Sequence, residues 1–241
     1  MAGGHYVALS GMRTRLDELD RLSADIANAN TSGYKTERTT DAQADRPQFA
    51  AVLKTAIDVT PGGRKLNVAN GPINTTGRDL DCAIEGNGFF VVQTAAGTRY
   101  TRNGRFSVSA DGTLVTEDGS EVVGANGAIK LAKNGGDIRV EADGTIKTGE
   151  TVAGKLSVVQ FTDPTQLMRE SGAIFRSEAA ATPVANASVK GGALEESNVS
   201  VVERVAELTT VKRSFEALQK ALTMMMNDID GRAVDQLGRR A

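Results

Sequence analysis

The sequence predicts a mainly β protein with α-helical ends, in which a central all-β domain is carried on a discontinuous coiled-coil domain. Apolar residues recur at three- and four-residue spacing near both ends of the chain. Between them, short β-branched runs are separated by Gly-containing turn dipeptides. We therefore expect helical segments at residues 1–34 and 199–241, a central β domain at 78–178, and connectors at 35–77 and 179–198.

The composition is that of a soluble folded protein and excludes several classes of function. The 241 residues are 24% charged and 40% hydrophobic, and the formal net charge is −2 with both signs mixed along the chain. No basic stripe is present, which argues against binding to nucleic acid or to an anionic membrane. We expect neither a transmembrane segment nor a cleaved secretory signal, because no long apolar run occurs.

The N-terminal segment predicts a helix with a narrow apolar seam. Its apolar positions are Leu9, Met12, Leu16, Leu19 and Ile26. One polar slot falls at Ser23, next to Leu22, and the other helix faces are charged. Residues such as Asn28 and Gly33 favour the end of a helix, so we expect it to end near residue 28.

The C-terminal segment has the more regular pattern, with every position of the seam apolar. The seam consists of Leu208, Val211, Phe215, Leu218, Leu222, Met225 and Ile229. Ser200 and Glu203 have the spacing of a capping box, which predicts a helix from Val201 to a stop near Gly231. Glu195 and Glu196 precede this helix, and we expect them to interact favourably with its dipole.

The two seams favour a paired bundle. A single amphipathic helix ordinarily packs on the core of its own domain. Here the repeat is close to 3.5 residues, as in coiled coils, and the two helices lie at opposite ends of a β-rich chain. A two-helix pair buries only one seam, so we expect these helices to be marginally stable until neighbouring molecules cover the rest.

The middle of the chain predicts strands and hairpins. The β-branched runs are Phe89–Gln93, Leu114–Thr116, Gly119–Val123 and Lys155–Phe161. Two stretches nearly repeat, Val108–Thr116 and Val140–Thr148, which share Ala-Asp-Gly-Thr. We expect two similar hairpin turns, since a third copy, as a solenoid would need, is missing.

No catalytic, metal or cofactor site is predicted. The single histidine, His5, lies where a pocket is hard to build, and Cys82, the only cysteine, is expected to be a buried structural residue. Gly86 to Gly88 form a turn into a strand instead of a phosphate-binding loop. The carboxylates that precede glycines suit turns better than a calcium loop, and they are Asp111, Asp118 and Asp143.

Three blocks of sequence resemble the bacterial flagellar rod and hook proteins. They are Ser10-Gly11-Met12 with Leu16-Asp17 and Ile26–Lys35, then Leu80-Asp81, Ala83–Gln93 and Tyr100–Phe106, and finally Ser197-Asn198-Val199. The blocks follow the order of the family and span the whole chain. Asp25 stands where the family usually has Asn, and it is expected on a flank of the helix.

The resemblance implies a structural subunit of the basal-body rod, not an enzyme. The length and the lean segment after the first helix are most like proximal rod proteins, with distal rod proteins as the runner-up. The implied partners are other rod subunits, copies of the chain itself, the flagellar type III export apparatus and an export chaperone. The implied location is the rod where it crosses the periplasm, reached without signal cleavage.

The expected interaction residues are the two seams and the turn that follows the first helix. In that turn they are Asn28, Asn30, Thr31, Gly33 and Tyr34. Two alternatives from other classes remain at this point. One is an extracellular adhesin or binding module whose helices merely dimerise, and the other is a hydrolase that uses carboxylates of the β domain.

Overall fold

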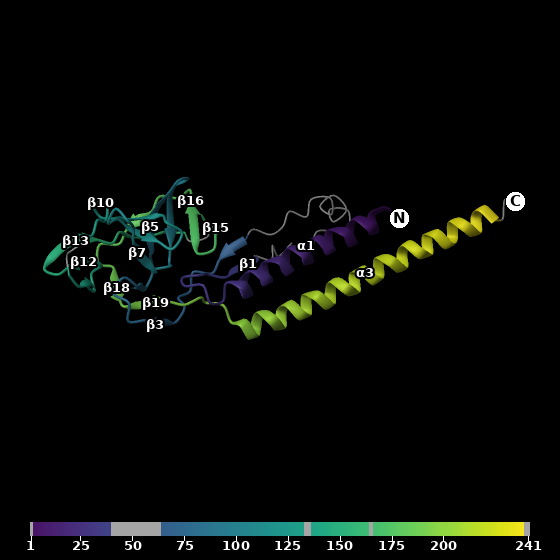
Figure 1. Cartoon of the computed structure of the whole chain (residues 1–241). Coiled ribbons are helices and arrows are strands. Elements are labelled where there is room, and N and C mark those ends of the chain that lie inside the picture. Colours follow the sequence, from purple (N-terminus) through teal and green to yellow (C-terminus); the bar gives the residue numbers. More distant parts are fainter. Residues whose placement is uncertain (1, 40–63, 133–135, 164–165, 239–241) are drawn as a thin grey trace. The chain divides into compact units, whose positions relative to one another are not determined.

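The computed structural model describes residues 2–39, 64–132, 136–163 and 166–238. The chain divides into two compact units. The helical unit contains helices α1 (Ala2–Ala27) and α3 (Val201–Gly238), and the β unit contains residues 27–38 and 64–200 (Figure 1). Residues 40–63 of the predicted connector lie outside the described residues.

The strands are short and follow one another closely along the chain. The first ten are β1 (Glu37–Thr39), β2 (Arg64–Leu66), β3 (Ile73–Thr75), β4 (Cys82–Glu85), β5 (Phe89–Thr94), β6 (Gly97–Thr101), β7 (Phe106–Val108), β8 (Leu114–Thr116), β9 (Glu121–Gly124) and β10 (Gly127–Ala128). The others are β11 (Ile138–Val140), β12 (Thr145–Thr148), β13 (Thr151–Lys155), β14 (Val158–Gln160), β15 (Leu167–Ser171), β16 (Ile174–Ser177), β17 (Thr182–Pro183), β18 (Ser188–Gly191) and β19 (Ala193–Glu195). The predicted class, mainly β with a helix near each end, is confirmed.

Strand β5 lies at the centre of the largest sheet and separates two apolar cores. The sheet order is β15-β16-β6-β5-β9-β8-β7, and β14 also pairs with β5. Successive side chains of a strand point to opposite faces. Phe90 and Val92 accordingly join one core, whereas Phe89 and Val91 join the other. This strand reads as an unbroken apolar run because both of its faces are buried.

The near-repeat forms two similar hairpin turns, as predicted. β7 pairs antiparallel with β8, and β11 pairs antiparallel with β12. In the first turn the Gly112 amide donates to the Ser109 carbonyl, and in the second the Gly144 amide donates to the Glu141 carbonyl, at 3.0 and 2.9 Å. The shared Asp-Gly therefore places the same backbone turn in two different sheets.

Paired strands also lie outside residues 78–178. β3 pairs with β19, and β4 pairs with β18, so segments more than a hundred residues apart in sequence meet. β3 and β19 have three residues each, which is too short for a period-two pattern to stand out. The β unit therefore includes much of what the sequence pattern predicts as connectors.

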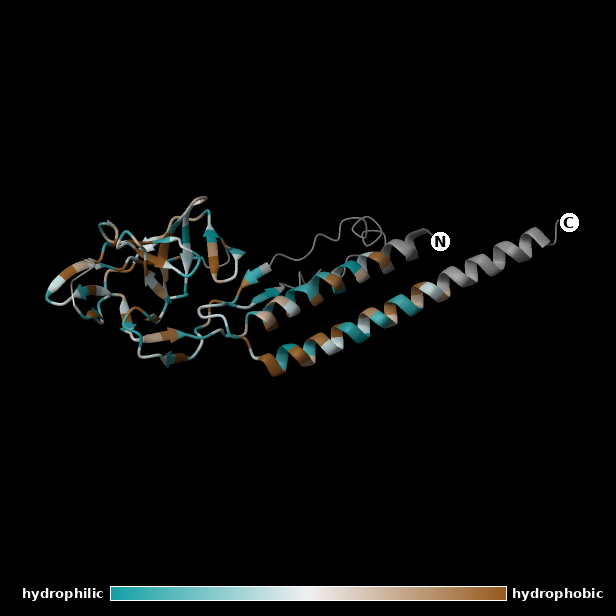
Figure 2. Cartoon of the chain, in the orientation of Figure 1, coloured by the Kyte–Doolittle hydropathy of each residue, from teal (hydrophilic) through white to brown (hydrophobic). Residues whose placement is uncertain are grey.

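The helices begin and end largely where the capping signals place them. α1 ends at Ala27 and α3 begins at Val201, as predicted. The predicted stop near Gly231 is wrong, since α3 continues to Gly238. A single glycine costs a helix only about 1 kcal/mol, and good helix formers follow it. Polar and apolar bands alternate along α1 and α3 in Figure 2.

Neither of the helices in the described part of the chain has a stretch long and apolar enough to cross a membrane.

Cys82 should behave as an inert reporter of global unfolding. Its side chain is fully buried in β4, and burial, with a smaller contribution from the Asp81 carboxylate, raises the pKa of its thiol to about 12. A thiol-specific reagent at neutral pH is expected to leave the native protein unmodified and to label it fully in urea. Rapid labelling of the native protein would contradict the buried position.

Candidate assembly site

The seam of α1 stays largely uncovered within one chain. Leu9 and Leu16 are 53% and 46% exposed, and Met12, Leu19 and Ile26 are half-buried.

Leu22, which is not part of the predicted seam, is fully buried, while Ser23 is exposed. An α-helix turns every 3.6 residues, so a seam written with a strict 3.5 repeat drifts around the helix.

The seam of α3 is likewise incompletely covered. Val211 is buried, and the next seam positions on either side are half-buried, namely Leu208, Phe215, Leu218 and Leu222. Met225 and Ile229 belong to the backbone of α3, but their side chains lie outside the described residues. Val202 and Met224 add apolar surface, at 83% and 69% exposure. A single chain thus leaves apolar helix surface available for contact.

Asp25 is not on an exposed flank of α1, contrary to the sequence expectation. Its side chain is 1% exposed, and its Oδ2 lies 3.5 Å from Arg21 Nη1 and 3.5 Å from Arg204 Nε of α3. A buried carboxylate needs positive partners, because an isolated buried charge is very costly. The two helices of this unit are therefore joined by an ion pair.

The predicted turn after α1 consists of two linked hydrogen-bonded turns in the β unit. The Thr31 amide donates to the Asn28 carbonyl at 3.1 Å, and the Tyr34 amide donates to the Thr31 carbonyl at 3.2 Å. The Thr31 hydroxyl also donates to Asn28 Oδ1 at 3.2 Å. Asn30 is exposed, whereas Gly33 and Tyr34 are buried. The short polar side chains thus satisfy the backbone locally.

Gly33 is required at its position by both conformation and space. Its φ is +70°, in the left-handed region that favours glycine. A Cβ added there would lie 2.3 Å from the backbone of both Arg102 and Asn103. The Gly33 amide donates to the Glu195 carbonyl at 2.8 Å, so the backbone passes directly against two distant segments.

Lys35, Arg102 and Glu195 form a buried charged cluster, which we call the ionic node. Lys35 Nζ lies 2.5 Å from Glu195 Oε1, and Arg102 Nη1 lies 2.8 Å from Glu195 Oε2. Their side chains are 0%, 2% and 1% exposed in the order Lys35, Arg102, Glu195. Both oxygens of Glu195 are occupied here, and its expected interaction with the dipole of α3 stays a prediction.

Backbone groups supply further hydrogen bonds to the ionic node. Lys35 Nζ also donates to the Ala69 carbonyl at 2.8 Å, and the Gly71 amide donates to Glu195 Oε1 at 2.9 Å. Arg102 Nη2 donates to the Gly86 carbonyl at 2.6 Å. A buried ion pair is tolerated when its remaining donors and acceptors find such partners.

Burial lowers the pKa of Lys35 and of Arg102, because desolvation disfavours their charged forms. The charge and the hydrogen bonds of the Glu195 carboxylate act in the opposite direction and raise both pKa values. Glu195 is thus the group that keeps two cations inside the β unit. The node carries one negative charge against two positive ones.

Asn198 and Arg169 tie the strand after the turn to the rest of the β unit. The Thr36 amide donates to Asn198 Oδ1 at 2.8 Å, and Asn198 Nδ2 donates to the Asn67 carbonyl at 2.9 Å.

Arg169 Cζ lies 4.0 Å from the Tyr34 ring centre, and its guanidinium binds the Lys35 carbonyl and the Glu37 carboxylate. Tyr34 therefore packs beneath a cation that is itself paired.

Two of the three carboxylates that precede glycines are hydrogen-bonded to neighbouring side chains. Asp118 accepts hydrogen bonds from the hydroxyls of Thr116 and Ser120, and Asp143 accepts them from Thr145 and Lys155. Each carboxylate thus accepts hydrogen bonds from residues of its own turn, as expected for an aspartate that stabilises a turn.

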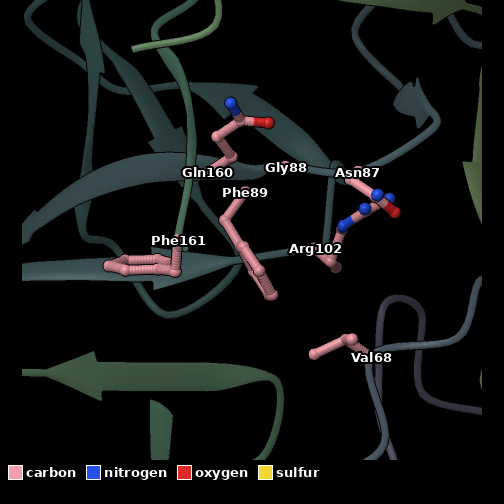
Figure 3. A pocket seen from close by; sticks show the side chains of 7 residues that line it. All are labelled: Val68, Asn87, Gly88, Phe89, Arg102, Gln160 and Phe161. Carbon is pink, nitrogen blue, oxygen red and sulfur yellow. The ribbon is translucent and has the colours of Figure 1, made fainter. Parts of the chain in front are cut away.

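One small cavity adjoins the ionic node. It has a volume of about 110 Å³ and is lined by Val68, Asn87, Gly88, Phe89, Arg102, Gln160 and Phe161 (Figure 3). Arg102 is the charged member of this lining, and its guanidinium is already bound to Glu195 and to Gly86. The cavity therefore offers no acid and base pair.

Replacing Glu195 by Gln should destabilise the protein by roughly 3 kcal/mol or more, because it leaves two buried cations without a counter-charge. Glu196→Gln is the matched control. Glu196 is exposed and accepts a hydrogen bond from Asn74, so its loss should change stability by less than about 0.5 kcal/mol. Urea unfolding measures both, and equal effects would argue against the node.

Gly33→Ala should cost far more stability than Gly77→Ala. Gly77 has a φ of +75°, close to that of Gly33, but a Cβ there would meet nothing within 4 Å. Gly77→Ala should therefore lose only the about 1–2 kcal/mol of stability that alanine costs in the left-handed region. The additional loss at Gly33, measured by urea unfolding, reports the contact with Arg102 and Asn103. Equal losses would mean that the backbone moves aside freely.

Three families of known proteins match successive segments of the chain. The family "Flagella basal body rod protein" matches residues 6–35, "Flagellar hook protein FlgE/F/G D1 domain" matches residues 83–148, and "Flagellar basal body rod FlgEFG protein C-terminal" matches residues 190–233. Lys35, Arg102 and Glu195 fall one in each of these segments.

Several curated proteins are similar over nearly the full length. The flagellar basal-body rod protein FlgF of Caulobacter vibrioides is 35% identical over 97% of this chain and 97% of its own. FlgF of Rhizobium meliloti is 32% identical over 99% of both chains. The flagellar basal-body rod protein FlgG of Bacillus subtilis is 32% identical over 90% of this chain and 93% of its own. The chain belongs to the flagellar basal-body rod protein family.

Proposed function

We propose that this chain is a structural subunit of the bacterial flagellar basal-body rod and that it occupies the proximal rod. Membership of the rod protein family supports the structural role. Similarity to FlgF proteins at 30–35% identity supports the proximal position, with the distal rod as the alternative. The observation that carries the proposal is the apolar surface left uncovered on both helices, since a subunit that must assemble needs such a surface.

In this proposal the two helical segments form the polymerising core. Residues 1–34 and 199–241 pair as a coiled coil, and the half-buried seams are covered when helices of neighbouring subunits pack beside them. Contacts of a non-closing, head-to-tail kind then propagate a rod. Residues 78–178 form the main part of the β domain, and the paired strands in 64–77 and 179–198 extend it.

The turn and the ionic node give the subunit its stiffness under load. Torque that passes from the motor to the hook and filament must cross the segments that lead into both helices. Those segments contain Gly33, Lys35 and Glu195, which are held by short hydrogen bonds and by steric contact. A buried cluster with several ion pairs and hydrogen bonds is rigid, so it deforms little when force is applied.

The partners in this proposal are other rod subunits, copies of the same chain and the flagellar type III export apparatus. The chain is exported without signal cleavage and joins the rod where it crosses the periplasm. Each helix exposes apolar positions until it assembles, which is the kind of surface that an export chaperone covers. Assembly and completion of the helical core are then one event.

The adhesin and hydrolase alternatives lack comparable support. A hydrolase would need two carboxylates that face one cleft, but Asp118 and Asp143 each bind within their own turns. An adhesin whose helices merely dimerise would also expose its seams in a single chain, so the similarity to rod proteins is what disfavours it.

Deleting residues 205–241 should leave a folded, soluble β unit that neither assembles nor supports motility. Phe215→Ser is a finer test. Because Phe215 is half-buried in one chain, the change should weaken each subunit contact by about 2 kcal/mol. That loss is roughly a 30-fold drop in association.

Arg213→Ser, at an exposed position off the seam, is the matched control and should assemble normally. Light scattering of purified subunits and motility of a complemented strain give the two readouts. Persistent assembly of the deletion variant would refute the proposed role of the helices.

A further inference from the structure

Two contacts between α1 and α3 lie in one antiparallel register. Near one end of the helical unit, Asp25 Oδ2 lies 3.5 Å from Arg204 Nε. Further along, a Cβ added at Gly11 would lie 3.8 Å from Leu218 Cδ1. The two contacts are fourteen residues apart on both helices, which is two heptads. The register is therefore constant over roughly 20 Å of paired helix.

The apolar seams cannot select this register by themselves. The seam of α3 repeats every three or four residues and is apolar at every position, with side chains that range in size from Val211 to Phe215. Sliding one helix along the other by a turn or a heptad would again place apolar residues against apolar residues. In coiled coils such degeneracy is commonly resolved by a single polar or charged position in the interface.

Asp25 is such a position: it pairs with Arg21 of its own helix, and Arg204 is the cation that faces it from α3. Residues three or four positions from Arg204 are Val201, Glu207, Ser200 and Leu208, and the residue one heptad on is Val211. Each of these slips would place an uncharged or a negative side chain opposite a carboxylate that is 1% exposed. The next cations along α3, Lys212 and Arg213, are eight and nine positions away.

We propose that Asp25 and Arg204 are positioning residues that fix the register of α1 against α3. The register in turn fixes which part of α3 extends beyond α1. Ala2 is level with residue 227, so residues 228–238 continue for eleven residues, or about 16 Å, past the start of α1 (Figure 1). Resting on the proposed function, this overhang is the segment of α3 that an adjoining subunit meets.

Disulfide trapping in the full-length chain tests the register directly. Gly11→Cys is combined in turn with Leu218→Cys, with Ser214→Cys and with Leu222→Cys, which sample the observed register and one helical turn to either side. Cys82 is buried and does not compete. With Asp25 and Arg204 intact, the 11–218 disulfide should form in preference to the other two. Equal yields from the three pairs would overturn the proposal.

The same three pairs are then compared in variants of the ion pair. Asp25→Leu with Arg204→Met removes both charges and keeps an apolar interface, so the preference for 11–218 should fall toward equal yields. Asp25→Glu keeps the charge and should keep the preference. Asp20→Leu, at an exposed position of α1, is the control and should leave the yields unchanged.

An unchanged preference in the apolar double variant would show that seam packing sets the register, and the proposal would fail. If that variant does not fold, as judged by its helical circular dichroism, Asp25→Asn replaces it, with the same two outcomes. Trapping in isolated chains does not depend on assembly. A loss of preference would therefore support the ion pair even if the deletion of residues 205–241 left assembly intact.

Discussion

Glu195 accepts ion pairs from Lys35 and Arg102 inside the β unit, and the fold around it follows from the need to keep those charges paired. The three residues come from widely separated segments of the chain, so the cluster forms only when those segments are in place together. Gly33 passes against the same region, where a larger residue would meet the backbone of Arg102. Strands β3 and β19 pair beside it, and Glu195 itself is the last residue of β19.

The local features of this structure could be predicted because their signals are local. The end of α1, the start of α3 and the twin Asp-Gly turns each depend on a few adjacent residues. The ionic node could not be predicted, since Lys35 and Glu195 lie in segments with no periodic pattern and their pairing spans the chain. A signal was present, because Lys35 and Arg102 are charged residues inside otherwise apolar or turn-rich motifs. The burial of Asp25 was missed because its partner Arg204 lies in a helix at the other end of the chain.

The two units differ in how completely their interactions are satisfied. In the β unit, apolar side chains fill two cores and the buried charges are paired. In the helical unit, seam residues such as Leu9 and Leu16 remain about half exposed. Folding of one chain is therefore complete in the first unit and incomplete in the second. This division is expected of the proposed rod subunit, in which the β unit would be fixed before assembly and the helix surface would stay available for contact.

The ionic node also affects the chain before it folds. A core built only from aliphatic side chains would expose all of that apolar surface in the unfolded state, where it promotes aggregation. Lys35, Arg102 and Glu195 occupy interior positions with groups that water solvates well when the chain is open. They add no apolar surface to the unfolded chain. In the folded chain they can be paired in only one arrangement. Solubility before folding and uniqueness after it thus arise from the same three side chains.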